Sequence, residues 1–133
     1  MIRLFAVALS LWTLSSCTLL VPRMDRARAA ALEAEAIHNI QVLHTAQVQY
    51  MSMNGKYATT LGALSDLIPA DIATGQKGGY KFTMVSTPGG YEITALPIKF
   101  GETGNRTFFS DQSMVVHQNR SNAPATSSSP ELQ

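Results

Sequence analysis

Three histidines, His38, His44 and His117, are the only imidazole side chains that could bind a metal or transfer a proton near neutral pH. His38 and His44 are six residues apart in a segment whose composition favours a helix, so their side chains point about 120° apart around its axis. Histidines that share a metal on one helix are instead four residues apart. We therefore expect these histidines to lie at the surface or in loose packing, with no metal between them.

The serines and glycines also lack the patterns that support catalysis. No serine lies in the Gly-x-Ser-x-Gly turn of a hydrolase nucleophile. Gly75, Gly78 and Gly79 precede a strand-like segment, whereas a phosphate-binding glycine loop precedes a helix. We expect no catalytic residue, no cofactor and no small-molecule substrate, and hence no enzymatic activity.

The single cysteine, Cys17, is the residue whose surroundings do indicate chemistry. A short basic start, residues 1–3, is followed by an apolar run from Leu4 to Leu14, which is the layout of a secretory signal peptide. The run ends in Leu-Ser-Ser-Cys, which resembles a bacterial lipobox. This resemblance implies cleavage of residues 1–16 and lipidation of Cys17, which would anchor the chain to membrane lipid through a tether, residues 17–22.

Two other interpretations of this segment stay open. Leu4 to Val21 is eighteen uncharged residues long, the lower limit for a helix that crosses a membrane, and such a helix would remain uncleaved. Cleavage without lipidation would instead secrete the chain. In each case the remainder faces away from the cytoplasm, so we expect a membrane-anchored protein of the bacterial cell envelope that faces the periplasm or the cell surface.

Length and charge restrict the kind of partner. A chain of 133 residues has room for one domain, and a net charge of +1 with 14% charged residues creates no field that would attract nucleic acid. Arg23, Arg26 and Arg28 follow the tether, where they form either a solvated face or a set of contacts with anionic lipid headgroups.

Residues 23–54 are expected to form one long helix around which the domain is organised. The segment contains no Gly and no Pro, with Pro22 just before it and Gly55 just after it. Spacings of three and four residues predict a buried face made of Ala36, Ile40, Leu43, Gln47, Tyr50 and Asn54, widened by Leu32, Ile37, Val48 and Met51. The part before Ala36 has little to bury and is expected to be a stalk.

A connector, residues 55–78, should follow the helix. Thr59 or Thr60 can cap a short helix that places Leu61, Leu64 and Leu67 on one side and ends at Pro69. A single turn is expected over 71–75 and a flexible loop over 75–79.

Residues 79–118 change to the period of two that is typical of strands. The predicted inward positions are Tyr80, Phe82 and Met84 in one strand and Tyr91, Ile93 and Ala95 in the next, with a turn at 87–90 between them. Segments 106–110 and 114–117 are a third and a fourth strand, separated by a turn at 111–113. We therefore predict an α+β fold in which the long helix packs against an antiparallel sheet of three or four strands. Residues 119–133 are small and polar and are expected to be disordered.

This order of elements resembles the head domains of type IV pilins and type II secretion pseudopilins. The similarity extends over about Glu33 to His117. Its motifs are Glu33-Ala34, Ala36-Ile37, Thr45-Ala46-Gln47, Gly55-x-Tyr57, Gly79-Tyr80-x-Phe82, Gly90-Tyr91, Thr94-Ala95-x-Pro97, Gly101-x-Thr103-Gly104-x-Arg106-x-Phe108 and Asp111-Gln112-Ser113. The resemblance implies a pilin-like head and other envelope, secretion or pilus proteins as partners.

The N-terminus departs from that pattern. Pilin leaders end in Gly and are followed by an apolar helix with a glutamate at its fifth residue, but this chain has no Gly before Gly55 and no acidic residue before Asp25. We therefore expect a membrane-anchored, non-enzymatic protein that acts by protein–protein contacts. The alternative is an atypical minor pilin or pseudopilin of a pilus or secretion filament, retained by an uncleaved N-terminal helix.

A third possibility is a small ligand- or calcium-binding module. Major pseudopilins bind calcium in a loop of the corresponding sheet, and Glu102, Asn105 and Asp111 carry side-chain oxygens in this part of the chain. Calcium takes six to eight oxygen ligands, and this loop offers few. We therefore expect no metal site here. The four tyrosines, Tyr50, Tyr57, Tyr80 and Tyr91, are expected to fill the core between sheet and helix.

Overall fold

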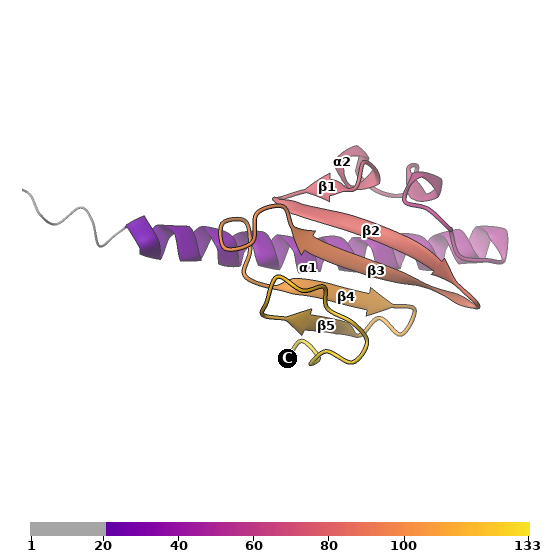
Figure 1. Cartoon of the computed structure of the whole chain (residues 1–133). Helices are drawn as coiled ribbons and strands as arrows, with labels where there is room; N and C mark the ends of the chain where they lie inside the picture. The colour runs from indigo at the N-terminus through magenta and orange to yellow at the C-terminus, as the bar shows by residue number, and fades with distance from the viewer. Residues whose placement is uncertain (1–20) are drawn as a thin grey trace, which may run out of the picture.

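A computed structural model describes residues 21–133 of the chain, and the side chains of residues 23–133. The fold is α+β: helix α1 (Val21–Asn54) lies against one face of an antiparallel sheet, and its first turns extend beyond that sheet (Figure 1). The predicted signal peptide and Cys17 lie outside the described residues. Within those residues, no helix combines the length and the apolar character needed to span a bilayer.

The sheet has five strands, whereas the sequence predicted three or four. They are β1 (Gln76–Lys77), β2 (Tyr80–Thr87), β3 (Gly90–Pro97), β4 (Thr107–Asp111) and β5 (Val116–Asn119), each paired antiparallel with the next. The unexpected strand is β1, which lies where a flexible loop was predicted over 75–79. Gly78 and Gly79 have φ values of 58° and 76°. They form the two-residue turn of a β hairpin, a conformation for which glycine is well suited.

The core lies between α1 and the inner face of the sheet. Four of the predicted helix positions are buried: Ala36, Ile40, Leu43 and Gln47. The predicted inward residues of the two long strands are buried as well: Tyr80, Phe82, Met84, Tyr91, Ile93 and Ala95. Tyr50 and Tyr57 are half-buried at the edge of this core. The periodicities of 3.6 and 2 therefore located both faces of the main interface.

The packed part of α1 begins and ends earlier than predicted. Ala29 and Glu33 are buried in the segment expected to be a stalk, because the loop between β3 and β4 folds against it. At the other end Val48, Met51 and Asn54 are exposed, since the sheet does not cover this side of the helix there.

The connector contains a 3₁₀ turn, η1 (Gly62–Leu64), and a one-turn helix, α2 (Ala70–Ala73). The short helix predicted to end at Pro69 is only this 3₁₀ turn, and its N-cap residue is Leu61, which makes no side-chain cap bond. Thr60 lies one residue earlier, where its hydroxyl oxygen accepts a hydrogen bond of 3.2 Å from the Ala63 backbone N–H. Leu64 and Ile72 anchor the two turns in the core.

The C-terminal segment follows a defined path instead of the predicted disorder. It runs back along β5 (Figure 1), where Gln118 N–H donates to the Pro130 carbonyl oxygen at 2.8 Å and Leu132 N–H to that of Val116 at 2.7 Å. Ala125 is buried and Leu132 packs against the core. Local turns pair part of its polar backbone, and the hydrogen bonds to β5 together with these two apolar side chains attach the segment to the sheet.

Candidate interaction surface

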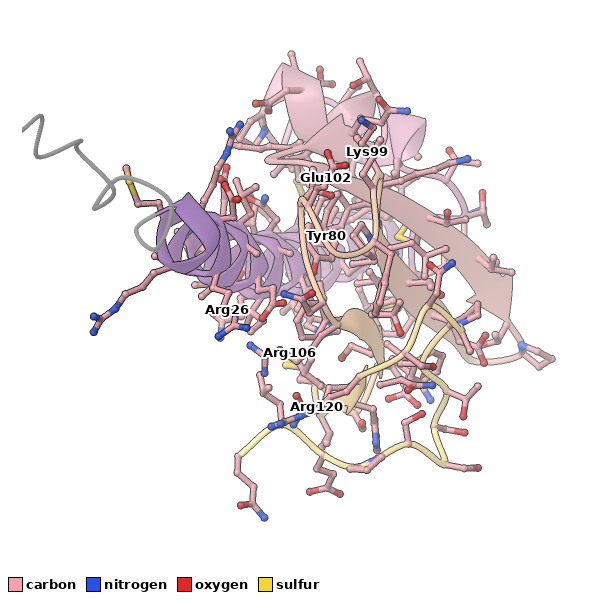
Figure 2. All side chains as sticks on the ribbon, turned by 60° about the vertical axis from the view of Figure 1, so that its left-hand side comes forward. Arg26, Tyr80, Lys99, Glu102, Arg106 and Arg120 are labelled. Carbon is pink, nitrogen blue, oxygen red and sulfur yellow. The ribbon has the colours of Figure 1, made fainter. Side chains whose placement is uncertain are left out.

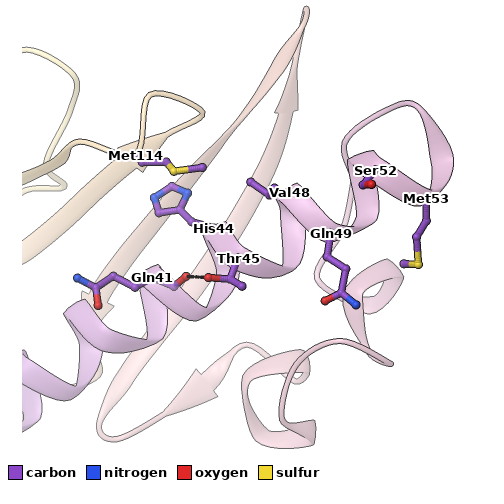
Figure 3. A pocket seen from close by; sticks show the side chains of 8 residues that line it. All are labelled: Gln41, His44, Thr45, Val48, Gln49, Ser52, Met53 and Met114. Carbon is purple, nitrogen blue, oxygen red and sulfur yellow. Dashed lines mark hydrogen bonds between the residues drawn. The ribbon is translucent and has the colours of Figure 1, made fainter.

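An open groove of about 610 Å³ lies on α1, on a side of the helix that the sheet leaves uncovered (Figure 3). Gln41, Thr45, Val48 and Ser52 follow one another at steps of four, three and four, so they form one stripe along the helix. Gln49 and Met53 extend the groove toward the end of the helix, and Met114 closes it from the turn between β4 and β5.

The apolar side chains of this groove are unusually accessible. Val48 is 47% exposed, Met53 is 61% exposed and Met114 is 50% exposed. Methionine is flexible and polarisable, so it adapts to partner surfaces of different shape. Exposed apolar side chains that gather in one groove can mark a protein–protein contact site.

Met114 is held in an unfavourable backbone conformation. Its φ is 65°, the one positive value at a non-glycine residue between residues 21 and 133. It follows a turn closed by a 2.9 Å hydrogen bond from Met114 N–H to the Asp111 carbonyl oxygen. Glycine or asparagine is usual in this left-handed conformation, which costs other residues about 1–2 kcal/mol. The conformation places the Met114 side chain next to the His44 ring, over the groove (Figure 3).

His44 forms the floor of the groove at this point and is buried with both ring nitrogens hydrogen-bonded, whereas a histidine at the surface or in loose packing was predicted. Its Nε2 lies 2.7 Å from the Ser110 hydroxyl oxygen, and its Nδ1 lies 2.7 Å from the Tyr91 hydroxyl. Ser110 donates its own proton to the Val115 carbonyl oxygen at 2.8 Å. Ser110 must therefore accept from the Nε2–H of His44, which leaves Nδ1 as the acceptor for Tyr91.

This direction of donation gives the Ser–His pair a structural role. A catalytic serine gives its proton to the histidine, but here the histidine donates and Ser110 is fully buried. Burial lowers the pKa of His44, and the nearby Asp111 carboxylate opposes that shift more weakly. Burial also raises the pKa of Tyr91 to about 12, with smaller contributions from Tyr57 and Asp111. The network therefore joins α1 to β3 and β4 through neutral groups.

A second polar cluster joins α1 to the other end of the sheet. Glu33 accepts from the Nε–H of Arg106 at 2.7 Å and from the backbone N–H of Asn105 at 2.7 Å. Arg106 also donates to the Gln118 side-chain oxygen at 2.8 Å. Tyr80 donates its hydroxyl proton to the Arg106 carbonyl oxygen at 2.7 Å, and burial raises its pKa. A side chain at Gly104 would collide with that hydroxyl, which explains the glycine.

The three oxygen-bearing residues considered for calcium do not form one site. Glu102 forms an ion pair with Lys99 at 3.4 Å, and the backbone N–H of Asn105 donates a hydrogen bond to Glu33. Asp111 lies at the far end of β4, where it accepts from Ser113 N–H and its pKa is lowered mainly by that residue. Across residues 21–133, no group of three metal-binding side chains of the His, Cys, Asp and Glu types is assembled.

Of the other predicted residues, His38 is exposed as expected, and His117 is half-buried with its Nδ1 2.7 Å from the Ser129 carbonyl oxygen. The sequence does not predict the groove, because the spacing places Val48 on the buried face, whereas the structure exposes it. Two signals were present. Met53 is out of phase with that face, and Met114 is a large apolar residue directly after the turn residues 111–113.

Comparison with known proteins identifies no relative of this chain. No family model matches the chain, and neither a curated protein nor a solved structure is significantly similar to it.

Proposed function

We propose that this chain is a non-enzymatic, membrane-anchored protein of the bacterial envelope that acts through contacts with other envelope proteins. The observation that carries the proposal is the apolar groove on the uncovered side of α1, with Val48, Met53 and Met114 exposed. Met114 is exposed at the strained turn and Met53 is exposed on α1. Accessible apolar side chains of this kind can bind a partner protein.

The order of elements supports a pilin-like head. A single long helix, a short connector and an antiparallel meander are the elements on which the resemblance to pilin and pseudopilin heads rests. The anchor we propose is lipid attached to Cys17, since the residues before it have the layout of a lipoprotein signal peptide.

A second candidate is an atypical minor pilin or pseudopilin subunit, held by an uncleaved N-terminal helix. It is favoured by the bounds of α1, which already includes Val21, the last residue of the segment Leu4 to Val21 considered as a membrane helix. In that case the groove would contact neighbouring subunits of a filament.

Mass spectrometry of the protein extracted from membranes separates the two candidates. A lipidated chain that begins at Cys17 supports the lipoprotein. An intact chain with an unmodified Cys17 thiol rejects it in favour of the filament subunit.

Photo-crosslinking in cells tests the contact surface. A photoreactive amino acid at Val48 or Met53 should give discrete protein adducts. The same amino acid at Val85, which is 53% exposed on β2, is the matched control and should give none. Equal adduct patterns from Val48 and Val85 would show that the groove is no special contact site.

A further inference from the structure

Three arginines from distant parts of the sequence line one hollow at the end of the molecule where α1 begins. Arg26 comes from α1, Arg106 from the residue before β4, and Arg120 from the residue after β5 (Figure 2). The hollow has a volume of about 440 Å³, and Ala30, Glu33 and Asn105 complete its lining.

The hollow carries excess positive charge. Glu33 is its only acidic lining residue, and both carboxylate oxygens are already occupied by Arg106 and the Asn105 backbone. Within residues 21–133, neither Arg26 nor Arg120 forms an ion pair. Three guanidinium groups against one carboxylate leave a surplus of two charges.

Arg106 is positioned to hold an anion rather than merely to balance Glu33. Its Nε–H bonds Glu33 and one Nη1–H bonds Gln118, and its guanidinium carbon lies 5.4 Å from the centre of the Phe108 ring. A guanidinium has five N–H groups, so three remain for a ligand, and its planar shape suits phosphate oxygens. The contacts to Glu33, Gln118 and Phe108 fix its orientation in advance.

The surroundings indicate an interface with lipid. The loop between β3 and β4 lies at the same end (Figures 1 and 2) and exposes two large apolar side chains, Ile98 at 53% and Phe100 at 38%. Basic and exposed apolar side chains at one end of a molecule are a combination that binds anionic membrane surfaces, and the acidic Glu102 of this loop is paired with Lys99. This end is also the one from which the chain continues toward Cys17.

We propose that the hollow formed by Arg26, Arg106 and Arg120 binds the phosphate group of an anionic phospholipid. Binding would hold the head against the membrane in one orientation, with the groove on α1 turned toward partners. The choice of lipid over free phosphate rests on the proposed membrane anchor and on the apolar loop, whereas the phosphate chemistry rests on the arginines alone.

The test is thermal unfolding of the full chain in a neutral detergent. The added probes are dihexanoyl phosphatidylglycerol, dihexanoyl phosphatidylcholine and inorganic phosphate. Phosphatidylglycerol at ten times its Kd should raise the Tm by about 4–8 °C, because it binds the native state only. The zwitterionic lipid and inorganic phosphate should raise it less.

Three variants locate the site. Arg26→Gln and Arg120→Gln should each raise the Kd for phosphatidylglycerol about tenfold, since each removes a charge-assisted contact. Arg23→Gln removes the same charge three residues earlier on α1, outside the hollow, and should leave the Kd unchanged. All three should keep the Tm of the unmodified chain without ligand, because no described ion pair is lost.

Two results would overturn the proposal. An equal loss of affinity in Arg23→Gln would mean a general charge effect without a site. A Tm rise with inorganic phosphate that phosphatidylglycerol does not exceed would assign the hollow to a soluble anion. This measurement does not depend on Cys17, so an unlipidated Cys17 thiol would reject the anchor without affecting the result.

Discussion

Gln47 shows how one buried polar residue fixes the start of the connector. Its Oε1 accepts from the Ala58 backbone N–H at 2.8 Å, and its Nε2 donates to the Ala58 carbonyl oxygen at 3.0 Å. The side chain thus pairs both backbone groups of Ala58, which is itself buried. By contrast, the buried Nδ2 of Asn39 on the same helix has no hydrogen-bond partner within the described structure.

Replacing Gln47 by Leu should therefore lower the free energy of unfolding by about 2–4 kcal/mol, because two buried backbone groups lose their partners. Denaturant unfolding measures this change. Gln49→Leu, two residues along on the exposed side, is the matched control and should stay within about 0.5 kcal/mol of the parent. Equal effects would mean that the bonds to Ala58 contribute no stability.

His44 makes stability depend on pH near neutrality. Its pKa in the folded protein lies below the ordinary 6.5, chiefly because of burial. The unfolded chain therefore binds the proton more readily, so stability is complete above pH 6.5 and is lost as the pH falls below it. The lowered pKa of Asp111 also makes stability fall as the pH falls, but only below its ordinary pKa of 3.8, well under the range in which His44 titrates.

Thermal unfolding between pH 7.5 and 5.0 should show a falling Tm that His44→Gln flattens. His38→Gln, a change at an exposed histidine of the same helix, should leave the slope unaltered. A slope that persists in His44→Gln would assign the pH dependence to another group.

At the scale of elements, α1 has two different long sides. Ile40 and Leu43 are fully buried under the sheet, whereas Val48 is 47% exposed in the groove. Ile40→Ala or Leu43→Ala should cost about 2–5 kcal/mol of unfolding free energy, since each leaves a cavity in the core. Val48→Ala is the control on the same helix and should change it by less than about 0.5 kcal/mol. An unchanged free energy of unfolding in Leu43→Ala would contradict the conclusion that this side of α1 is packed against the sheet.

The turn between β4 and β5 combines strain with exposure. Met114→Gly should change the unfolding free energy by less than about 1 kcal/mol, because relief of the positive φ offsets the lost contact with the groove. The same change should remove crosslinks from Val48 if the groove binds a partner. A large loss of stability would show that Met114 serves the fold instead.

The sequence was informative wherever a periodic pattern was long. The centre of the buried face of α1, from Ala36 to Gln47, and the inward residues of β2 and β3 follow from spacing, whereas the two ends of that face do not. The sequence was less informative at short elements. A strand of two residues, such as β1, is too short to show an alternating pattern. The Gly78-Gly79 pair was nevertheless a hairpin signal that could have been used.

The polar contacts were not predictable in the same way. The bonds from His44 to Tyr91 and Ser110 join residues 47 and 66 positions apart, so only the register of the sheet on the helix brings them together. Arg120 enters the basic hollow because Asn119, at the end of β5, pairs with Thr107 at the start of β4, next to Arg106, and no local pattern indicates this pairing.

At the scale of the whole molecule, three features follow one another along the axis of α1. The basic hollow lies at the end where the chain enters, the core lies along the middle, and the groove lies toward the far end with its two methionines. The buried core residues lie between Ala29 and Ala125, downstream of the predicted anchor at Cys17. Anchoring and folding should therefore respond to different mutations.

Two variants test this separation. Cys17→Ala should shift the protein out of the membrane fraction, or leave its signal peptide unprocessed, while the Tm of the purified chain stays within about 1 °C of the parent, because a change outside the core is nearly neutral. Ile40→Ala should do the reverse, with a lower Tm and an unchanged distribution between fractions. If Cys17→Ala stays in the membrane and its mass differs from that of the parent by the substitution alone, the anchor is the uncleaved apolar segment itself. The filament-subunit alternative then becomes the better account of a head that already begins its helix at Val21.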